Sequence, residues 1–171
     1  MGMELRVSHV GSFPFEYSRD LVEKIVSDLY NIGIDIPPYP QLRSFIDIYL
    51  EPLARDGALV KKGDFYFTTR DRLKSFDLSG FKPIVYEAED MIDFVRRRGI
   101  EFKGYRAPVT GVFTLASRIY LVEDIARGLD ATVLRDRELV EEYIFPFVVK
   151  YIEYMKNLGY THLFIDEPVL G

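Results

Sequence analysis

The chain has 171 residues, enough for one ordinary domain with a sizeable core. It carries 22 basic and 27 acidic residues, a net charge of −5, which argues against a general nucleic-acid surface. Without cysteine it can form neither disulfides nor thiolate metal sites of its own. It contains neither a membrane-length apolar stretch nor an N-terminal signal-peptide pattern, so we expect a cytoplasmic protein with no membrane partner. Many Glu, Lys and Arg with few Asn and Gln indicate a thermophilic source.

The first third of the chain alternates strand and helix patterns. Residues 5–10 are a strand candidate closed by Gly11. Ser18 then suits the N-cap of an amphipathic helix that ends at Gly33. The apolar, proline-rich stretch 34–42 fits a short barrel strand that runs directly into a loop.

The middle third begins with a helical pattern over residues 45–55, bent or shortened by Pro52. Residues 58–70 predict a hairpin that turns at Lys62-Gly63-Asp64, an excursion from the main repeat. Residues 87–98 predict an amphipathic helix stopped by Gly99.

The last third predicts a strand and loop over 102–112, a helix over 114–126, and a long helix over 137–158. Pro146 predicts a kink near residues 142–145 of the long helix. Residues 160–165 form the last strand, whose continuous apolar run is typical of parallel strands buried on both faces.

About four strands that alternate with helices predict an α/β fold with a parallel (βα) repeat. A complete eight-stranded barrel needs about 250 residues, so the pattern fits half of a TIM-type barrel. We therefore expect residues 1–171 to form a single N-terminal half-barrel domain.

Polar groups follow the ends of the predicted strands, where barrel enzymes place their chemistry. The stretches are Val10-Gly-Ser-Phe-Pro14, Tyr39-Pro-Gln-Leu42, Pro108-Val-Thr-Gly111 and Asp166-Glu-Pro168. The Gly-Ser and Thr-Gly pairs are also ordinary turn sequences. The adjacent carboxylates Asp166 and Glu167 either cap a helix or bind a cation. His9 and His162 lie within strands, where a packed histidine is commoner than a ligand, and the chain shows no self-contained metal motif.

Taken together, these stretches resemble the cobalamin-independent methionine synthase family, within the uroporphyrinogen decarboxylase and methionine synthase-like barrel superfamily. The resemblance runs from about His9 to Pro168. It implies a methyltransferase of methionine biosynthesis that moves a methyl group from a folate or corrinoid donor to homocysteine or a related thiol.

The resemblance also implies roles for single residues. Gly11 and Ser12 would hold the carboxylate of homocysteine, and Asp166 would bind its ammonium group. Glu167 would support that site or cap the following segment, and Thr110 lies near the pocket by position. The family usually has a glutamate where this chain has Gln41, a neutral group that can accept a hydrogen bond without supplying charge.

Zinc activates the thiol in the intact family enzyme, and its His, Cys and Glu ligands come from the second half of the barrel. We therefore expect no cofactor within this chain, and no methyl transfer by the chain alone. A truncation, a split gene product and a degenerate half all fit the sequence.

Two other readings remain open. A non-catalytic half-barrel would pair with itself or with a complementary half, because it exposes strand edges and apolar interior. A decarboxylase-like relative would need arginines for substrate carboxylates, and Arg43 and Arg106 are its candidates.

Overall fold

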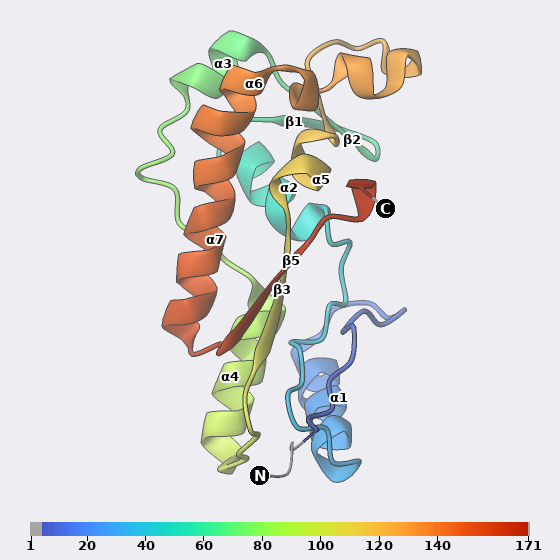
Figure 1. Ribbon diagram of the computed structural model, residues 1–171, viewed down its shortest axis with the longest axis vertical. Helices are drawn as coiled ribbons and strands as arrows, with labels where there is room; N and C mark the ends of the chain where they lie inside the picture. Colours follow the sequence, from blue (N-terminus) through green and yellow to red (C-terminus); the bar gives the residue numbers. More distant parts are fainter. Residues whose placement is uncertain (1–4, 171) are drawn as a thin grey trace. The chain divides into compact units, whose positions relative to one another are not determined.

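The computed structural model describes residues 5–170 and confirms the α/β class (Figure 1). Residues 1–4, which belong to the N-terminal stretch searched for a signal peptide, and residue 171 lie outside the described part. The chain forms two compact units. Unit 1 comprises Met1–Ser44, Val85–Pro108 and Glu153–Phe164, and unit 2 comprises Phe45–Ile84, Val109–Ile152 and Ile165–Gly171.

Two amphipathic helices of unit 1 form over the residues where the sequence predicts them. Helix α1 (Arg19–Asn31) begins at Ser18, whose side chain accepts a hydrogen bond from a backbone N–H of the first turn. Helix α4 (Tyr86–Arg98) ends at Gly99, which has a left-handed φ of 62°. The apolar faces of both helices are buried, and the two helices pack together.

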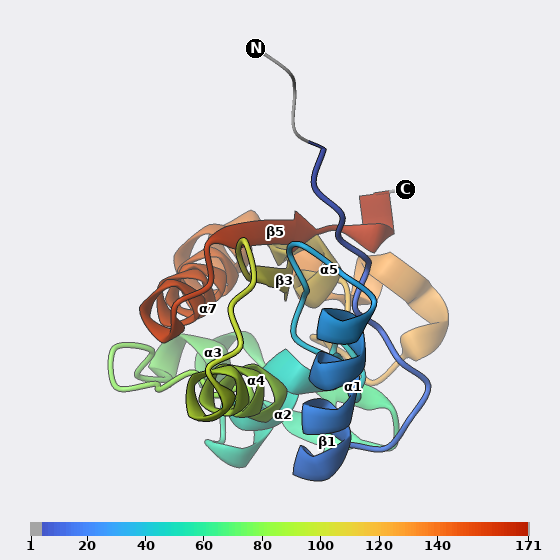
Figure 2. The ribbon, with the colours of Figure 1, turned by 90° about the horizontal axis from the view of Figure 1, so that it is seen from below.

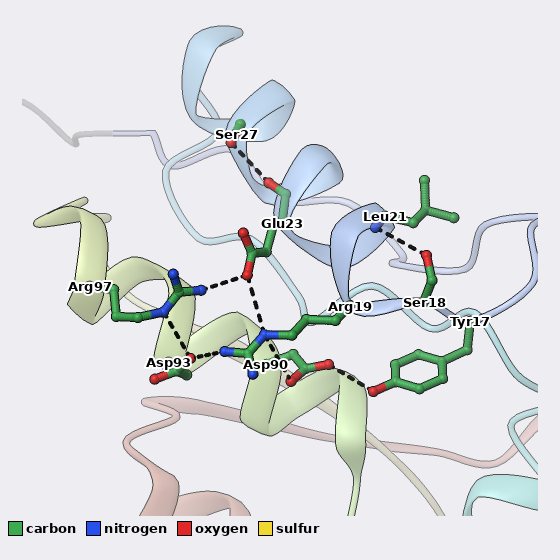
Figure 3. Close-up of polar contacts among 9 residues, drawn as sticks. All are labelled: Tyr17, Ser18, Arg19, Leu21, Glu23, Ser27, Asp90, Asp93 and Arg97. Atoms are coloured by element: carbon green, nitrogen blue, oxygen red, sulfur yellow. Dashed lines mark hydrogen bonds and ion pairs between the residues drawn. The ribbon is translucent and has the colours of Figure 1, made fainter.

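Charged side chains join α1 to α4 along the rim of this packing (Figure 3). Glu23 of α1 accepts hydrogen bonds from Arg19 at 3.3 Å and from Arg97 of α4 at 2.5 Å. Asp93 of α4 in turn pairs with both arginines. Each of these four charges thus has at least two partners, which makes this a network rather than a set of isolated surface pairs.

Four segments of unit 1 lie side by side in chain order, joined by backbone hydrogen bonds. The bonds are Ile36 N–H to Val7 O, Gln41 N–H to Gly11 O, Arg106 N–H to Pro37 O and His162 N–H to Tyr105 O. The two strands predicted over 5–10 and 34–42 are nevertheless wrong as continuous ladders. The structure has only isolated parallel bridges there, Ser12 to Gln41 and Pro38 to Arg106. Three prolines between residues 34 and 42 supply no N–H, which explains the interrupted pairing.

Strands β3 (Arg106–Thr110) and β5 (His162–Asp166) form a two-stranded sheet (Figure 2). Their hydrogen bonds advance in the same direction along both strands, so the strands are parallel. The expected burial of the last strand on both faces is wrong, since Phe164 and Ile165 are 45% and 47% exposed. Among the described residues β5 has a partner strand on one side only.

Unit 2 begins with helix α2 (Asp47–Arg55), which contains Pro52 and starts two residues later than predicted. Strands β1 (Val60–Lys62) and β2 (Phe65–Phe67) form an antiparallel hairpin where the sequence predicts one. The hairpin belongs to a three-stranded sheet, because β2 also pairs in parallel with β4 (Ile119–Tyr120). Helix α3 (Arg70–Ser75), capped by Thr69, was not predicted.

The helix predicted over 114–126 is wrong. Helix α5 (Val112–Ala116) is short, and strand β4 and the 3₁₀ turns η1 (Ile125–Ala131) and η2 (Val133–Arg135) follow it. Tyr120 accepts a hydrogen bond from the Thr68 N–H at 2.9 Å, and Leu121 donates to Ala131 at 2.8 Å. These long-range backbone bonds override the helical spacing of the sequence.

The long helix predicted over 137–158 is divided into three parts. They are helix α6 (Arg137–Leu139), the π turn η3 (Val140–Ile144) and helix α7 (Phe145–Leu158). The Phe145 N–H bonds to the Val140 carbonyl, five residues back, and the next residue is Pro146, which has no N–H. The disturbance expected near 142–145 therefore takes the form of a π turn. A final 3₁₀ turn, η4 (Pro168–Leu170), follows β5.

Aromatic rings fill the interior of unit 2. Tyr49 and Tyr151 lie with ring centroids 4.7 Å apart, and Phe147 lies 5.1 Å from Tyr151 and 5.3 Å from Phe81. All four side chains are at most 4% exposed. In the part of the chain that the structure describes, no helix is both long and apolar enough to span a membrane.

Candidate functional site

Gly11 joins the first parallel segment of unit 1 to the second. Its carbonyl accepts the Gln41 N–H at 2.9 Å, and two residues later the Phe13 N–H donates back to the Gln41 carbonyl at 3.1 Å. Gly11 has a φ of 106°, and a Cβ there would lie 2.8 Å from Cγ of Pro38. Both the backbone conformation and the close approach therefore require glycine at this position.

Ser12 and Gln41 meet next to Gly11. The Ser12 hydroxyl is exposed and donates to Oε1 of Gln41 at 3.2 Å. Gln41 itself is 8% exposed, and its Nε2 donates to the Tyr39 hydroxyl, which donates in turn to the Pro108 carbonyl at 2.9 Å. The buried Tyr39, which sequence reasoning missed, thus holds the amide of Gln41 while Ser12 faces solvent.

In unit 2, Asp166 and Glu167 have different surroundings although they are neighbours in the chain. The Asp166 side chain is exposed, and its main-chain carbonyl accepts the Gly111 N–H at 2.9 Å. The Glu167 carboxylate accepts the N–H groups of Phe113 at 3.0 Å and Thr114 at 2.8 Å. Glu167 therefore caps α5, the helix after β3, and not a segment that follows it.

Gly111 makes room for the Glu167 side chain. A Cβ on Gly111 would lie 2.7 Å from Cγ of Glu167 and closer still to its carboxylate. Thr110, the residue before it, is 2% exposed, and its hydroxyl donates to the Phe45 carbonyl at 2.8 Å. The Thr110 hydroxyl thus fixes the backbone of its own unit and presents almost no surface to a ligand.

A pocket of about 630 Å³ lies beside Glu167 in unit 2. Its walls come from α5, η2, α6, the π turn, the first residue of α7 and the residue after β5: Val112, Phe113, Leu134, Arg137, Val140, Glu141, Phe145 and Glu167. Arg137 and Glu141 pair with each other at 2.7 Å, and Glu167 is held by backbone N–H groups. Each charged side chain of the pocket therefore has a hydrogen-bond partner, and most of the pocket wall is apolar.

The two arginines proposed for substrate carboxylates differ in their surroundings, although both lie in unit 1. Arg43 forms a two-pronged pair with the fully buried Glu87, at 2.8 and 2.6 Å, and lies over the rings of Tyr17 and Tyr86. Arg106 donates to the His9 carbonyl at 2.6 Å instead of to a carboxylate. Arg43 is thus committed to a structural ion pair.

The residues described here do not fit the zinc that the resemblance implies for the intact enzyme. No group of three or more His, Asp or Glu side chains among residues 5–170 could hold a metal ion, and the sequence has no cysteine.

Comparison with protein-family models, with curated proteins and with solved structures gave no match. The resemblance to the methionine synthase family therefore stays a prediction from the motifs.

Proposed function

We propose that this chain supplies the amino-acid clamp of a methionine synthase-like methyltransferase, which transfers a methyl group to homocysteine or a related thiol. The observation that carries the proposal is made within each unit separately: an exposed polar side chain lies at the end of a parallel segment. Ser12 follows the first segment and Asp166 ends β5, and both side chains are exposed. Barrel enzymes use this position for their substrates.

We propose further that the parallel segments are half of a (βα)₈ barrel. Consecutive strands of such a barrel are neighbours in chain order and parallel, as are the four segments of unit 1. The half-exposed Phe164 and Ile165 on β5 support this proposal, because an apolar strand at an open edge suits a sheet that continues.

The arm proposed for the carboxylate consists of Gly11 and Ser12. A hydroxyl is a suitable donor to a carboxylate, and the bond to Gln41 holds the Ser12 side chain at the segment end. Ser12 can donate its single proton either to Gln41 or to a ligand. Binding would therefore exchange one acceptor for a charged one.

The arm proposed for the ammonium group is Asp166. Its carboxylate is exposed at the end of a strand whose backbone is fixed by the bond from Gly111. A carboxylate next to an ammonium group forms a charge-assisted hydrogen bond. Glu167 is engaged at the start of α5, so its role in this proposal is to fix the loop that carries Asp166. Because the described residues offer no ligand set for zinc, no step of the proposal involves the metal.

The proposal is tested by calorimetric titration of the full chain with homocysteine. Asp166→Asn should weaken binding by about 10- to 100-fold, since a hydrogen bond to a charged group contributes about 1.5–3 kcal/mol. Ser12→Ala should weaken it by less. Asp64→Asn, a change of the same kind at an exposed turn, is the matched control and should leave the affinity unchanged. An affinity that Asp166→Asn does not alter removes this residue from the clamp.

A second candidate function is favoured by the exposed apolar residues of β5. A non-catalytic half-barrel would bury Phe164 and Ile165 against a second copy or a complementary half. Sizing of the full chain over a range of concentrations separates the two proposals. Self-association that Phe164→Ser abolishes, together with no homocysteine binding, supports the second. A monomer that binds homocysteine supports the first.

A further inference from the structure

Arg106 is a half-buried arginine whose charge is not paired with any carboxylate among the described residues. One terminal nitrogen donates to the His9 carbonyl at 2.6 Å. The guanidinium carbon lies 4.2 Å from the centroid of the Phe164 ring, so one face of the group is covered. The Nε atom is buried without a hydrogen-bond partner.

His9 lies beside this arginine and has an unsatisfied atom of its own. Its Nε2 is buried without a hydrogen-bond partner, and its ring meets Phe13 edge-on at 5.6 Å. Burial lowers the pKa of His9, and the positive charge of Arg106 lowers it further. Nε2 of His9 and Nε of Arg106 therefore both lack a hydrogen-bond partner, which is rare for buried polar groups in folded proteins.

Arg43 of the same unit shows how this chain satisfies an arginine with a purely structural role. Arg43 has a two-pronged carboxylate partner in Glu87 and two tyrosine rings beside it. Arg106 has the ring but not the carboxylate. Among the described residues, Arg106 therefore differs from Arg43 in having no anionic acceptor.

We propose that Arg106, with His9 beside it and Phe164 against its face, binds an oxyanion of a small ligand, either a carboxylate or a phosphate. An arginine has five N–H bonds. One donates to His9 and one, on Nε, is buried, which leaves three on the terminal nitrogens. A planar guanidinium offers paired N–H bonds that match two oxygens of a carboxylate or a phosphate. The ring of Phe164 holds the guanidinium plane, so little freedom is lost when the anion binds.

This site does not depend on the methyl-transfer proposal. Arg106 can bind an oxyanion whether or not the chain binds homocysteine, and homocysteine can bind whether or not Arg106 binds an oxyanion. The two titrations therefore test the two proposals separately.

The test uses NMR of the full chain, because His9 and His162 are the only histidines and their imidazole signals are easily separated. His9→Gln assigns the His9 signal. Inorganic phosphate and succinate are titrated in separate experiments at constant ionic strength. A saturable shift of the His9 signal is expected, and the anion that saturates at lower concentration distinguishes phosphate from carboxylate.

Arg106→Gln should weaken the binding of the more tightly bound anion by about tenfold or more. This is the effect of losing at least one charge-assisted hydrogen bond. Arg98→Gln removes an equal charge from an exposed position in the same unit and is the matched control. The proposal is overturned if neither anion moves the His9 signal of the unmodified chain, or if Arg98→Gln weakens binding as much as Arg106→Gln. The first of these criteria holds even if Arg106→Gln does not fold.

Discussion

Replacing Gly111 by alanine should displace the Glu167 side chain and so remove the cap of α5. The φ of Gly111 is −81°, which alanine adopts without strain, so the backbone itself tolerates the change. The new methyl group would come within 2.7 Å of Cγ of Glu167 and closer to its carboxylate. A side chain can move away from such a contact more easily than a backbone can. The carboxylate would leave, and the N–H groups of Phe113 and Thr114 would lose their acceptor.

The size of the effect follows from the cap alone. Loss of a helix cap costs about 0.5–2 kcal/mol, and two bonds to a charged acceptor place this one near the upper end. We expect Gly111→Ala to lower the free energy of unfolding by about 1–2 kcal/mol. Glu167→Ala should cost about the same, because both changes remove the same two hydrogen bonds.

A double-mutant cycle measured by urea unfolding tests this reasoning. With Glu167→Ala already present, the methyl group meets no carboxylate, so Gly111→Ala should cost nothing or stabilise by about 0.4–1 kcal/mol through the unfolded chain. Asp64→Ala, at an exposed turn of the same unit, serves as a control for handling and fitting. If Gly111→Ala costs as much in the Glu167→Ala background as in the unmodified chain, the two residues are not coupled and the explanation is refuted.

Two further predictions concern unit 1. Arg43→Met should lower the free energy of unfolding by about 3–5 kcal/mol, because it leaves Glu87 buried and unpaired; Arg43→Met with Glu87→Gln should recover much of this loss in urea unfolding. Burial and the Asp90 carboxylate raise the pKa of Tyr17 from 10.0 to about 12. The unfolded chain therefore loses that proton first, so this stabilisation is complete below pH 10 and disappears between pH 10 and about 12. Tyr17→Phe should make the free energy of unfolding fall less steeply with pH between pH 10 and about 12. A slope equal to that of the unmodified chain would contradict this prediction.

Elements whose sequence signals act within one segment were predictable. Ser18 and Gly99 mark helix ends through their own side-chain and backbone chemistry, and both helices formed there. The region after α5 was not predictable, because its backbone bonds reach Thr68 and Ala131. The helical spacing over 114–126 carries no information about those distant partners. The same limitation explains why the sequence predicted burial on both faces of β5, since such burial depends on which distant elements pack against those faces.

The candidate site was predictable at the level of position and not of contacts. Ser12 and Asp166 were chosen because they follow predicted strands, and both are exposed in the structure. The sequence did not predict that the Tyr39 hydroxyl accepts a hydrogen bond from Gln41, because a tyrosine in an apolar segment is expected to be an ordinary core residue. Thr110 was predicted to lie near the pocket only from its position in the chain. In the structure its hydroxyl donates a hydrogen bond to the Phe45 carbonyl.

The adjacent carboxylates Asp166 and Glu167 show why a sequence motif can combine two functions. Successive side chains at a strand end point to opposite sides. Glu167 turns back to the start of α5, in the space that Gly111 leaves, whereas Asp166 stays exposed. The capping carboxylate fixes the backbone that carries the exposed one. Substituting Glu167 should therefore weaken a ligand at Asp166 indirectly, through loss of position. Glu167→Gln keeps one of the two acceptor oxygens, whereas Glu167→Ala keeps neither, so Glu167→Gln should retain more affinity; equal losses would contradict this graded, indirect role.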